Sequence, residues 1–122
     1  MRAVLDWELA TLGDPIADLG SMLAYWPQHD DAATSLFAAS ALPGFRSRDE
    51  LTAAYLSATG RDGSAVTFWH ALGLWKIAII CEGVVRRALE QPLNAAAGGP
   101  LDLALVEQMV ERAFLTLSSE EL

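Results

Sequence analysis

The sequence predicts a mainly α-helical chain that forms a single domain over residues 1–122. Three observations support this. The length is enough for one hydrophobic core, 52% of the residues are hydrophobic against 20% charged, and the apolar positions recur at helical spacing over most of the chain. The absence of a repeat period and of a Pro- and Gly-rich composition excludes solenoid, collagen-like and disordered classes.

The N-terminal residues predict one short strand followed by a helix. Val4 and Leu5 are apolar and lead into Asp6, which is typical of a β-strand that ends in a loop, so residues 1–6 are expected to form a strand and its loop. A helix is expected over 14–26, because Asp14 can act as N-cap and Pro15 suits the first helical position.

Two further helices are expected in the middle of the chain. The first, over 31–41, is alanine-rich and has a weak apolar face. The second, over 48–59, has clearer signals: Ser47 and Glu50 form a capping box at its start, and Gly60 can end it in a left-handed conformation.

The longest helix is expected over 64–91 and the last over 101–117. The first of these is apolar on nearly every side and predicts a buried helix, in which Gly73 and Gly83 indicate close contact with other helices. The last helix has an expected inner face of Leu105, Val106, Met109, Val110, Ala113 and Leu117. Its expected solvent face holds Glu107, Glu111 and Arg112.

Charge and cysteine content exclude several classes of partner and site. Sixteen acidic against eight basic residues give a net charge of −8, and Lys76 is the single lysine, so a nucleic-acid surface is not expected. The lone Cys81 cannot form an internal disulfide, which favours a reducing compartment. We expect a cytoplasmic protein without a membrane segment, because no signal sequence is recognisable and the apolar run 66–81 is shorter than the roughly 20 residues that cross a bilayer.

Four carboxylates are concentrated in the first eighteen residues: Asp6, Glu8, Asp14 and Asp18. An aspartate at the end of a strand can meet solvent or a metal while the sheet holds its backbone. Asp18 lies one turn into the first helix, near its apolar stripe, so it is expected to point inward and to accept backbone N–H groups of a neighbouring loop.

The string Val4-Leu5-Asp6-Trp7-Glu8-Leu9-Ala10-Thr11-Leu12-Gly13-Asp14-Pro15-Ile16-Ala17-Asp18-Leu19 resembles the aminoglycoside phosphotransferase and choline kinase-like family. The resemblance implies the helical C-lobe portion of a protein-kinase-like fold. It also implies that Asp6 binds the Mg²⁺ that bridges the phosphates of ATP, as the DFG aspartate of kinases does. On the same basis Asp14 caps the next helix and Asp18 stabilises the catalytic loop. Glu8 contacts the metal ligand Asp6 without binding the metal itself.

The resemblance extends to the long helix. Residues 69–87 are similar to the C-lobe of a bacterial branch related to phosphotransferase domains that are joined to acyl-CoA dehydrogenases. In the family, acids on C-lobe helices bind cationic or hydroxylated substrates, so Glu82 is a candidate substrate contact. The implied acceptor is a hydroxyl-bearing small molecule, with sugars, choline, antibiotics and acyl derivatives as open alternatives.

The sequence also departs from the family. The His-Gly-Asp-x-x-x-x-Asn catalytic loop and the lysine-bearing strand of the N-lobe are absent, and Lys76 lies inside a helix. We therefore expect a C-terminal part of an ATP- and Mg²⁺-dependent O-phosphotransferase that is inactive without the missing N-terminal half. The alternative is a non-catalytic helical module that forms homo-oligomers or docks on a partner through exposed apolar surface.

Other reactive or aromatic side chains are expected to be structural. His70 is expected to be a hydrogen-bonded core histidine, because no nucleophile and orienting group accompany it. Cys81 is expected to be a small buried hydrophobe. The four tryptophans are expected to lie in the core rather than to line a pocket.

Overall fold

The computed structural model describes residues 10–29, 31, 38–91 and 102–118, and within these ranges it contains four α-helices and one short 3₁₀ helix. The helices are α1 (Pro15–Ala24), α2 (Arg48–Thr59), α3 (Val66–Glu90) and α4 (Leu103–Ser118), and η2 (Ala38–Ala41) is the 3₁₀ turn. The mainly helical class expected from the sequence is thus confirmed. The expected strand over 1–6 lies outside the described residues.

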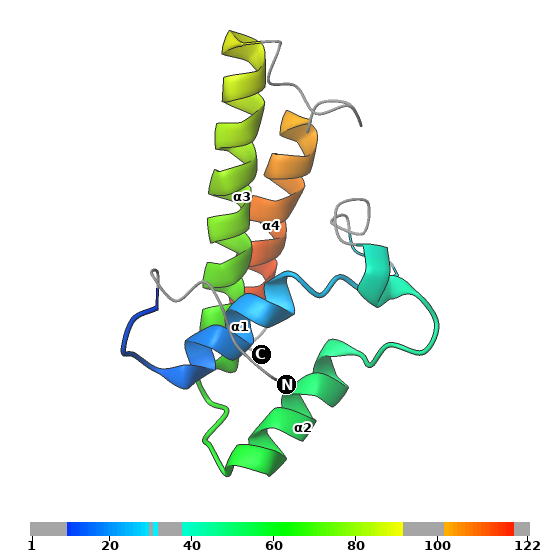
Figure 1. Cartoon of the computed structure of the whole chain (residues 1–122), viewed down its shortest axis with the longest axis vertical. Helices are drawn as coiled ribbons and strands as arrows, with labels where there is room; N and C mark the ends of the chain where they lie inside the picture. Colours follow the sequence, from blue (N-terminus) through cyan, green and yellow to red (C-terminus); the bar gives the residue numbers. More distant parts are fainter. Residues whose placement is uncertain (1–9, 30, 32–37, 92–101, 119–122) are drawn as a thin grey trace.

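Helix α3 is the element on which the others are assembled. It packs against α1 and against α4, and Figure 1 shows α4 running alongside α3 while α1 lies across its lower part. Seven buried residues form the core cluster: Ala24 of α1; Leu74, Ile77, Ala78 and Cys81 of α3; and Met109 and Ala113 of α4. The core therefore lies where α1 and α4 pack against α3.

Local sequence signals determine where α1 and α2 begin. Asp14 caps α1 by accepting the N–H of Ile16 at 2.9 Å, with proline at the first helical position. Ser47 accepts the N–H of Glu50, and the Glu50 carboxylate accepts the N–H of Ser47 at 2.8 Å, so the predicted capping box is confirmed. Gly60 ends α2 in the left-handed conformation, also as predicted.

The helix expected over 31–41 is described only at its two ends. Residues 32–37 lie outside the described part, and η2 is the helical segment that the structure gives at the end of the range. Asp31 closes a turn, in which its own N–H bonds to the carbonyl of Gln28 and its carboxylate accepts the N–H of Gln28. Its side chain therefore faces backward along the chain.

A close helix crossing joins α1 to α3. A Cβ at Gly20 would lie 2.5 Å from both the carbonyl carbon and the Cβ of Trp69, and a Cβ at Gly73 would lie 3.0 Å from the Cβ of Ala24. Only hydrogen in place of a side chain allows such an approach. The close contact expected at Gly73 is confirmed. The one expected at Gly83 is not found among the described residues, where a Cβ would meet only the end of the Arg87 side chain at 3.5 Å.

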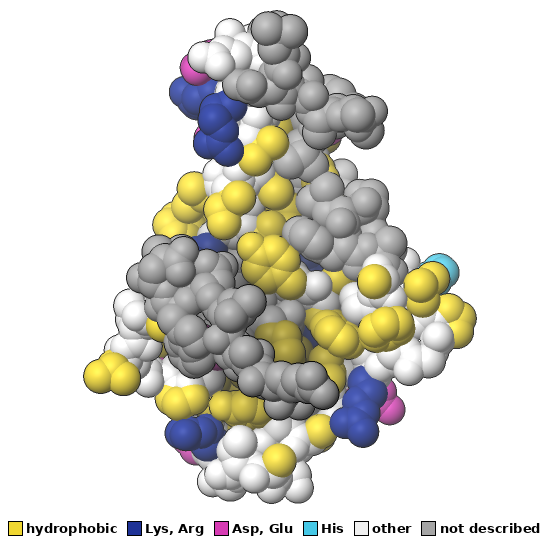
Figure 2. Space-filling view, viewed as in Figure 1, with side chains coloured by type: hydrophobic (Ala, Val, Ile, Leu, Met, Phe, Trp, Pro, Cys, Tyr) yellow, Lys and Arg dark blue, Asp and Glu magenta, His cyan; other side chains and the backbone are white. Residues whose placement is uncertain are grey.

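The apolar residues of α3 are not all buried, contrary to expectation. Trp75, Ile79 and Ile80 are 48–54% exposed, because α1 and α4 cover only part of the helix circumference. Figure 2 shows hydrophobic side chains gathered over the middle of one face of the molecule. By length and mean hydropathy α3 is long and apolar enough to cross a membrane. The shorter apolar run 66–81 was not. The packing of α3 against two other helices is the arrangement of a core helix.

The face expected to be the inner one of α4 is narrower than predicted. Met109 and Ala113 are buried, whereas Val110 and Leu117 are each 45% exposed. Arg112, expected on the solvent face, instead points into an ion pair with Asp31. Arg112 can point inward because the Asp31 carboxylate, on another segment of the chain, pairs with its charge. The spacing of residues within α4 does not reveal this partner.

Candidate functional site

Asp14 holds two elements together at the start of α1. One carboxylate oxygen accepts the N–H of Ile16 at 2.9 Å and the other accepts the indole N–H of Trp69, in the first turn of α3, at 3.1 Å. The predicted capping role is confirmed. Both oxygens accept hydrogen bonds, so the carboxylate of Asp14 ties the start of α1 to the first turn of α3.

A polar cleft of about 600 Å³ opens beside Asp14. The start of α1 forms one side and the loop between α2 and α3 the other, and the lining residues are Asp14, Ile16, Thr59, Gly60, Arg61, Asp62, Ser64 and Ala65. In that loop the Asp62 carboxylate accepts both the hydroxyl of Ser64 at 2.6 Å and its backbone N–H at 3.1 Å. These two bonds lower the pKa of Asp62. The loop that forms this wall of the cleft is therefore held by hydrogen bonds between its own residues.

The remaining N-terminal acids are only partly placed. Asp18 is exposed on α1, so the inward orientation expected for it is wrong: the stripe of Ile16, Leu19 and Leu23 turns toward α3 and leaves position 18 at its solvent side. Asp6 and Glu8 lie outside the described residues. Among the residues that are described, no group of three His, Cys, Asp or Glu side chains could hold a metal ion.

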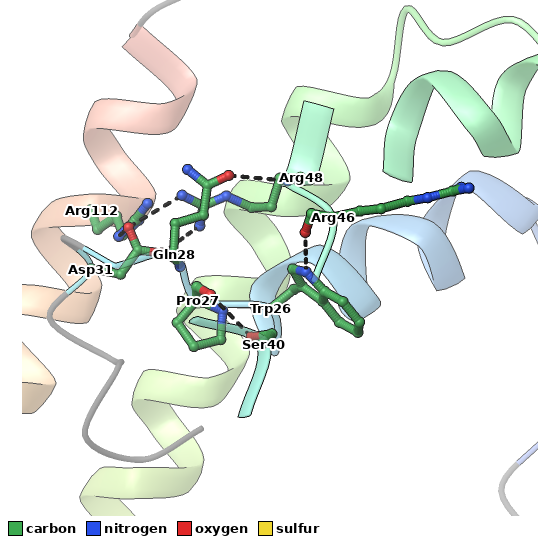
Figure 3. A network of polar contacts seen from close by, with 8 residues as sticks. All are labelled: Trp26, Pro27, Gln28, Asp31, Ser40, Arg46, Arg48 and Arg112. Atoms are coloured by element: carbon green, nitrogen blue, oxygen red, sulfur yellow. Dashed lines mark hydrogen bonds and ion pairs between the residues drawn. The ribbon is translucent and has the colours of Figure 1, made fainter. Parts of the chain in front are cut away.

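The strongest polar cluster was not predicted. Asp31, only 5% exposed in its side chain, accepts two bonds from the Arg48 guanidinium at 2.7 and 3.2 Å and also pairs with Arg112. The Gln28 side chain accepts the N–H of Arg48 at 3.0 Å. Figure 3 shows these residues converging from the chain after α1, from α2 and from α4. The cluster thus joins three elements.

The charges in this cluster affect two titratable groups. Burial acts to raise the pKa of Asp31, but the N–H of Gln28 and the two guanidinium groups outweigh burial, so the pKa is lowered. His70 lies nearby on α3. Burial, and then the positive charges of Arg48 and Arg112, lower its pKa to about 4. Its Nε2 is buried with no hydrogen-bond partner in the described part of the structure, so the expected hydrogen bond at this atom is not found.

Sequence reasoning missed this cluster because its members are distant in the chain. Asp31 and Arg48 are 17 residues apart, and Arg112 comes from the last helix. The sequence held one weak signal of the cluster: basic residues are few, and two of them, Arg48 and Arg112, lie on expected helices beside apolar positions. The arrangement stabilises the fold and offers no reactive group to a substrate.

Two further features of α3 bear on substrate binding. Glu82 pairs with Arg86 one turn later at 2.7 Å on a partly exposed surface, so its carboxylate is accessible. On the face toward α4, an apolar groove of about 260 Å³ is lined by Phe68, Ala71, Leu72, Trp75, Val110, Ala113, Phe114 and Leu117. Trp75 thus lines a hollow between α3 and α4 and is half exposed, contrary to the core position expected for it.

Comparison with known proteins identifies a family and several relatives. The model of the phosphotransferase enzyme family matches residues 1–64. Acyl-CoA dehydrogenase family member 11 of Mus musculus is 37% identical over 94 residues, which cover 71% of this chain and 12% of that protein. The Homo sapiens protein of the same name is 36% identical over 92 residues.

A second relative extends the match further along the chain. Acyl-CoA dehydrogenase family member 10 of Mus musculus is 34% identical over 124 residues, covering 92% of this chain and 11% of that protein. The chain thus spans roughly a tenth of the length of the curated relatives it matches. No solved structure matches it. Because the family model covers more than half of the 122 residues and includes the acidic N-terminal stretch, the chain belongs to the phosphotransferase enzyme family.

Proposed function

We propose that this chain is part of an ATP- and Mg²⁺-dependent small-molecule O-phosphotransferase. The observation that carries the proposal is the family match over residues 1–64, a range that includes Asp6 and the Gly13-Asp14-Pro15 sequence. Phosphoryl transfer depends on positioning and on charge stabilisation more than on covalent chemistry by the protein. The residues of interest are therefore those that hold charge in place.

Each N-terminal acid has a distinct proposed role. Asp6 is the ligand for Mg²⁺, with Glu8 supporting it, since carboxylate oxygens are the donors that this hard cation prefers. The metal ion neutralises charge on the phosphates of ATP. Asp14 is engaged in capping α1 and in binding Trp69. Asp18, exposed on α1, is available to brace a catalytic loop supplied by another segment.

The 122 residues contain no His-Gly-Asp-x-x-x-x-Asn sequence. In the family this loop supplies the aspartate that orients the acceptor hydroxyl, so we propose that transfer requires a segment that carries it. Removing a catalytic base and a metal ligand together abolishes nearly all of the rate enhancement of such enzymes. The chain alone is therefore expected to be inactive, and its principal partner is that segment. A cytoplasmic location fits this ATP-dependent role.

The helical part would supply the acceptor side of the site. Glu82 on α3 has an accessible carboxylate, which can bind a cationic or hydroxylated group. We propose a hydroxyl-bearing small molecule as the acceptor.

A non-catalytic docking or dimerisation module is the second candidate. The observation that favours it is the uncovered apolar groove between α3 and α4, whose rim includes Phe114 at 71% exposure and Trp75 at 48%. Contiguous exposed apolar surface can serve as an interaction site. A concentration-dependent dimer in sedimentation that is lost in a Phe114→Ser variant, together with an absence of metal binding at Asp6, would favour this candidate.

Metal binding tests the primary proposal. Mn²⁺, an EPR-active substitute for Mg²⁺, is titrated into the chain in the presence and absence of ATP, and the free ion is measured. Asp6→Asn is expected to weaken binding by at least tenfold, whereas Glu107→Gln, which removes an exposed carboxylate on α4, is expected to leave it unchanged. Equal loss in the two variants would show nonspecific binding to an acidic protein and would contradict the proposal.

A further inference from the structure

Trp69 contacts both the beginning and the middle of α1. Its indole N–H donates to Asp14 at 3.1 Å, across 55 residues of sequence. Its backbone lies against Gly20, where a Cβ would come within 2.5 Å. The same residue therefore holds α1 at two points more than one turn apart, and α1 cannot shift along α3 without disturbing one of them.

The indole is also held from its own side. Its ring makes an edge-to-face contact with Phe68 at a centroid distance of 5.2 Å. The acceptor is fixed as well, because the other carboxylate oxygen of Asp14 accepts the N–H of Ile16. A donor and an acceptor that are each restrained by a second contact make a hydrogen bond that determines position rather than one that only adds stability.

We propose that Trp69 is a positioning residue, which fixes through Asp14 the described entry into α1, residues 10–14. Seven residues lie between Asp6 and Asp14 in the sequence, and Asp14 is the point at which the start of α1 is tied to α3. The consequence for metal binding depends on the proposed function, because Asp6 must be the ligand. The effect of Trp69 on the order of the entry into α1 does not depend on the proposed function.

Two variants remove the contact in different ways. Trp69→Phe keeps an aromatic ring and the backbone packing on Gly20 but lacks the N–H donor. Asp14→Asn removes the charge and replaces one of the two acceptor oxygens by an NH2 group, which cannot accept the N–H that this oxygen now holds. Trp75→Phe is the matched control, since Trp75 lies on the same helix, is half exposed and lines the groove toward α4.

Two measurements are made on the full chain. Hydrogen exchange at the N–H groups of Ile16 and Ala17, which both donate to Asp14, reports the order of the entry into α1, and Mn²⁺ affinity reports the metal site. Both test variants are expected to speed exchange about threefold or more and to weaken Mn²⁺ binding about three- to tenfold, as expected for loss of one charge-assisted hydrogen bond. The double variant should be no worse than either single one. The urea midpoint of Trp69→Phe should match that of Trp75→Phe.

The outcomes separate this inference from the proposed function. Unchanged exchange at Ile16 and Ala17 in Trp69→Phe, or additive effects in the double variant, would overturn the positioning role. If Asp6→Asn leaves Mn²⁺ affinity unchanged, the proposed function fails, and exchange alone then decides whether Trp69 fixes the segment. A change in the urea midpoint together with faster exchange throughout α3 would show a general structural role and would also overturn the proposal.

Discussion

The crossing of α1 and α3 at Gly20 makes a precise prediction for stability. An alanine Cβ at this position would lie 2.5 Å from two atoms of Trp69 and 2.7 Å from the backbone nitrogen of His70. Carbon atoms in contact prefer roughly 3.5–4.0 Å, so the helices must separate by about 1 Å. The obstructing atoms are backbone and Cβ atoms, which cannot rotate away.

The magnitude follows from what this separation disrupts. Ile16, Leu19 and Leu23 are buried at this interface, and overpacking of a core costs about 1–3 kcal/mol. The gain in helix propensity from Gly to Ala offsets at most ~1 kcal/mol. We therefore expect Gly20→Ala to lower the free energy of unfolding by about 2 kcal/mol, within the range of core overpacking.

Urea denaturation followed by tryptophan fluorescence measures this effect, and Gly83→Ala is the control. At Gly83 a Cβ meets only a flexible arginine end at 3.5 Å, so the propensity gain remains and stability should rise by up to ~1 kcal/mol. The two identical substitutions should thus have opposite signs. A Gly20→Ala variant as stable as the unmodified chain would refute the helix crossing.

The remaining predictions concern the buried charges. Asp31→Asn leaves Arg48 and Arg112 without their carboxylate and should destabilise the chain by about 2–4 kcal/mol, because breaking a buried pair strands its partners; a loss below 1 kcal/mol in urea denaturation would show that the cluster is only a surface contact. The pKa of Asp31 is lowered, so its contribution is present above the usual carboxyl range and is lost as the pH falls through the folded-state pKa. The pKa of His70 is about 4 in the folded chain against 6.5 in its usual range. The unfolded chain binds the extra proton between these values, so stability should fall by up to about 3 kcal/mol from pH 6.5 to 4. His70→Gln should flatten urea midpoints over that interval, and an unchanged slope would contradict the assignment.

Local signals allowed a good part of the fold to be predicted from the sequence. Asp14 with Pro15, Ser47 with Glu50, and Gly60 each act within a few residues of one helix end, and the structure places them as expected. Such signals depend only on neighbouring backbone groups. They therefore remain valid whatever the tertiary arrangement.

Contacts between distant segments were not predictable in the same way. Gly20 resembles any helical glycine until α3 is known to cross it, and Arg112 was assigned to solvent because its partner Asp31 lies on another element. The candidate site divides similarly. Asp14 was placed correctly, Asp18 is exposed where an inward position was expected, and Asp6 and Glu8 lie outside the described residues.

The most direct test of the account asks where a divalent ion binds along the chain. Mn²⁺ broadens the NMR signals of nearby nuclei, so a ¹⁵N spectrum recorded at substoichiometric Mn²⁺ with ATP maps the site by residue. If Asp6 is the ligand, broadening should concentrate on residues 4–14 and disappear in Asp6→Asn. Broadening centred instead on Asp49 and Glu50, or spread evenly over the acidic surface, would contradict the claim that this chain carries the metal aspartate of a phosphotransferase.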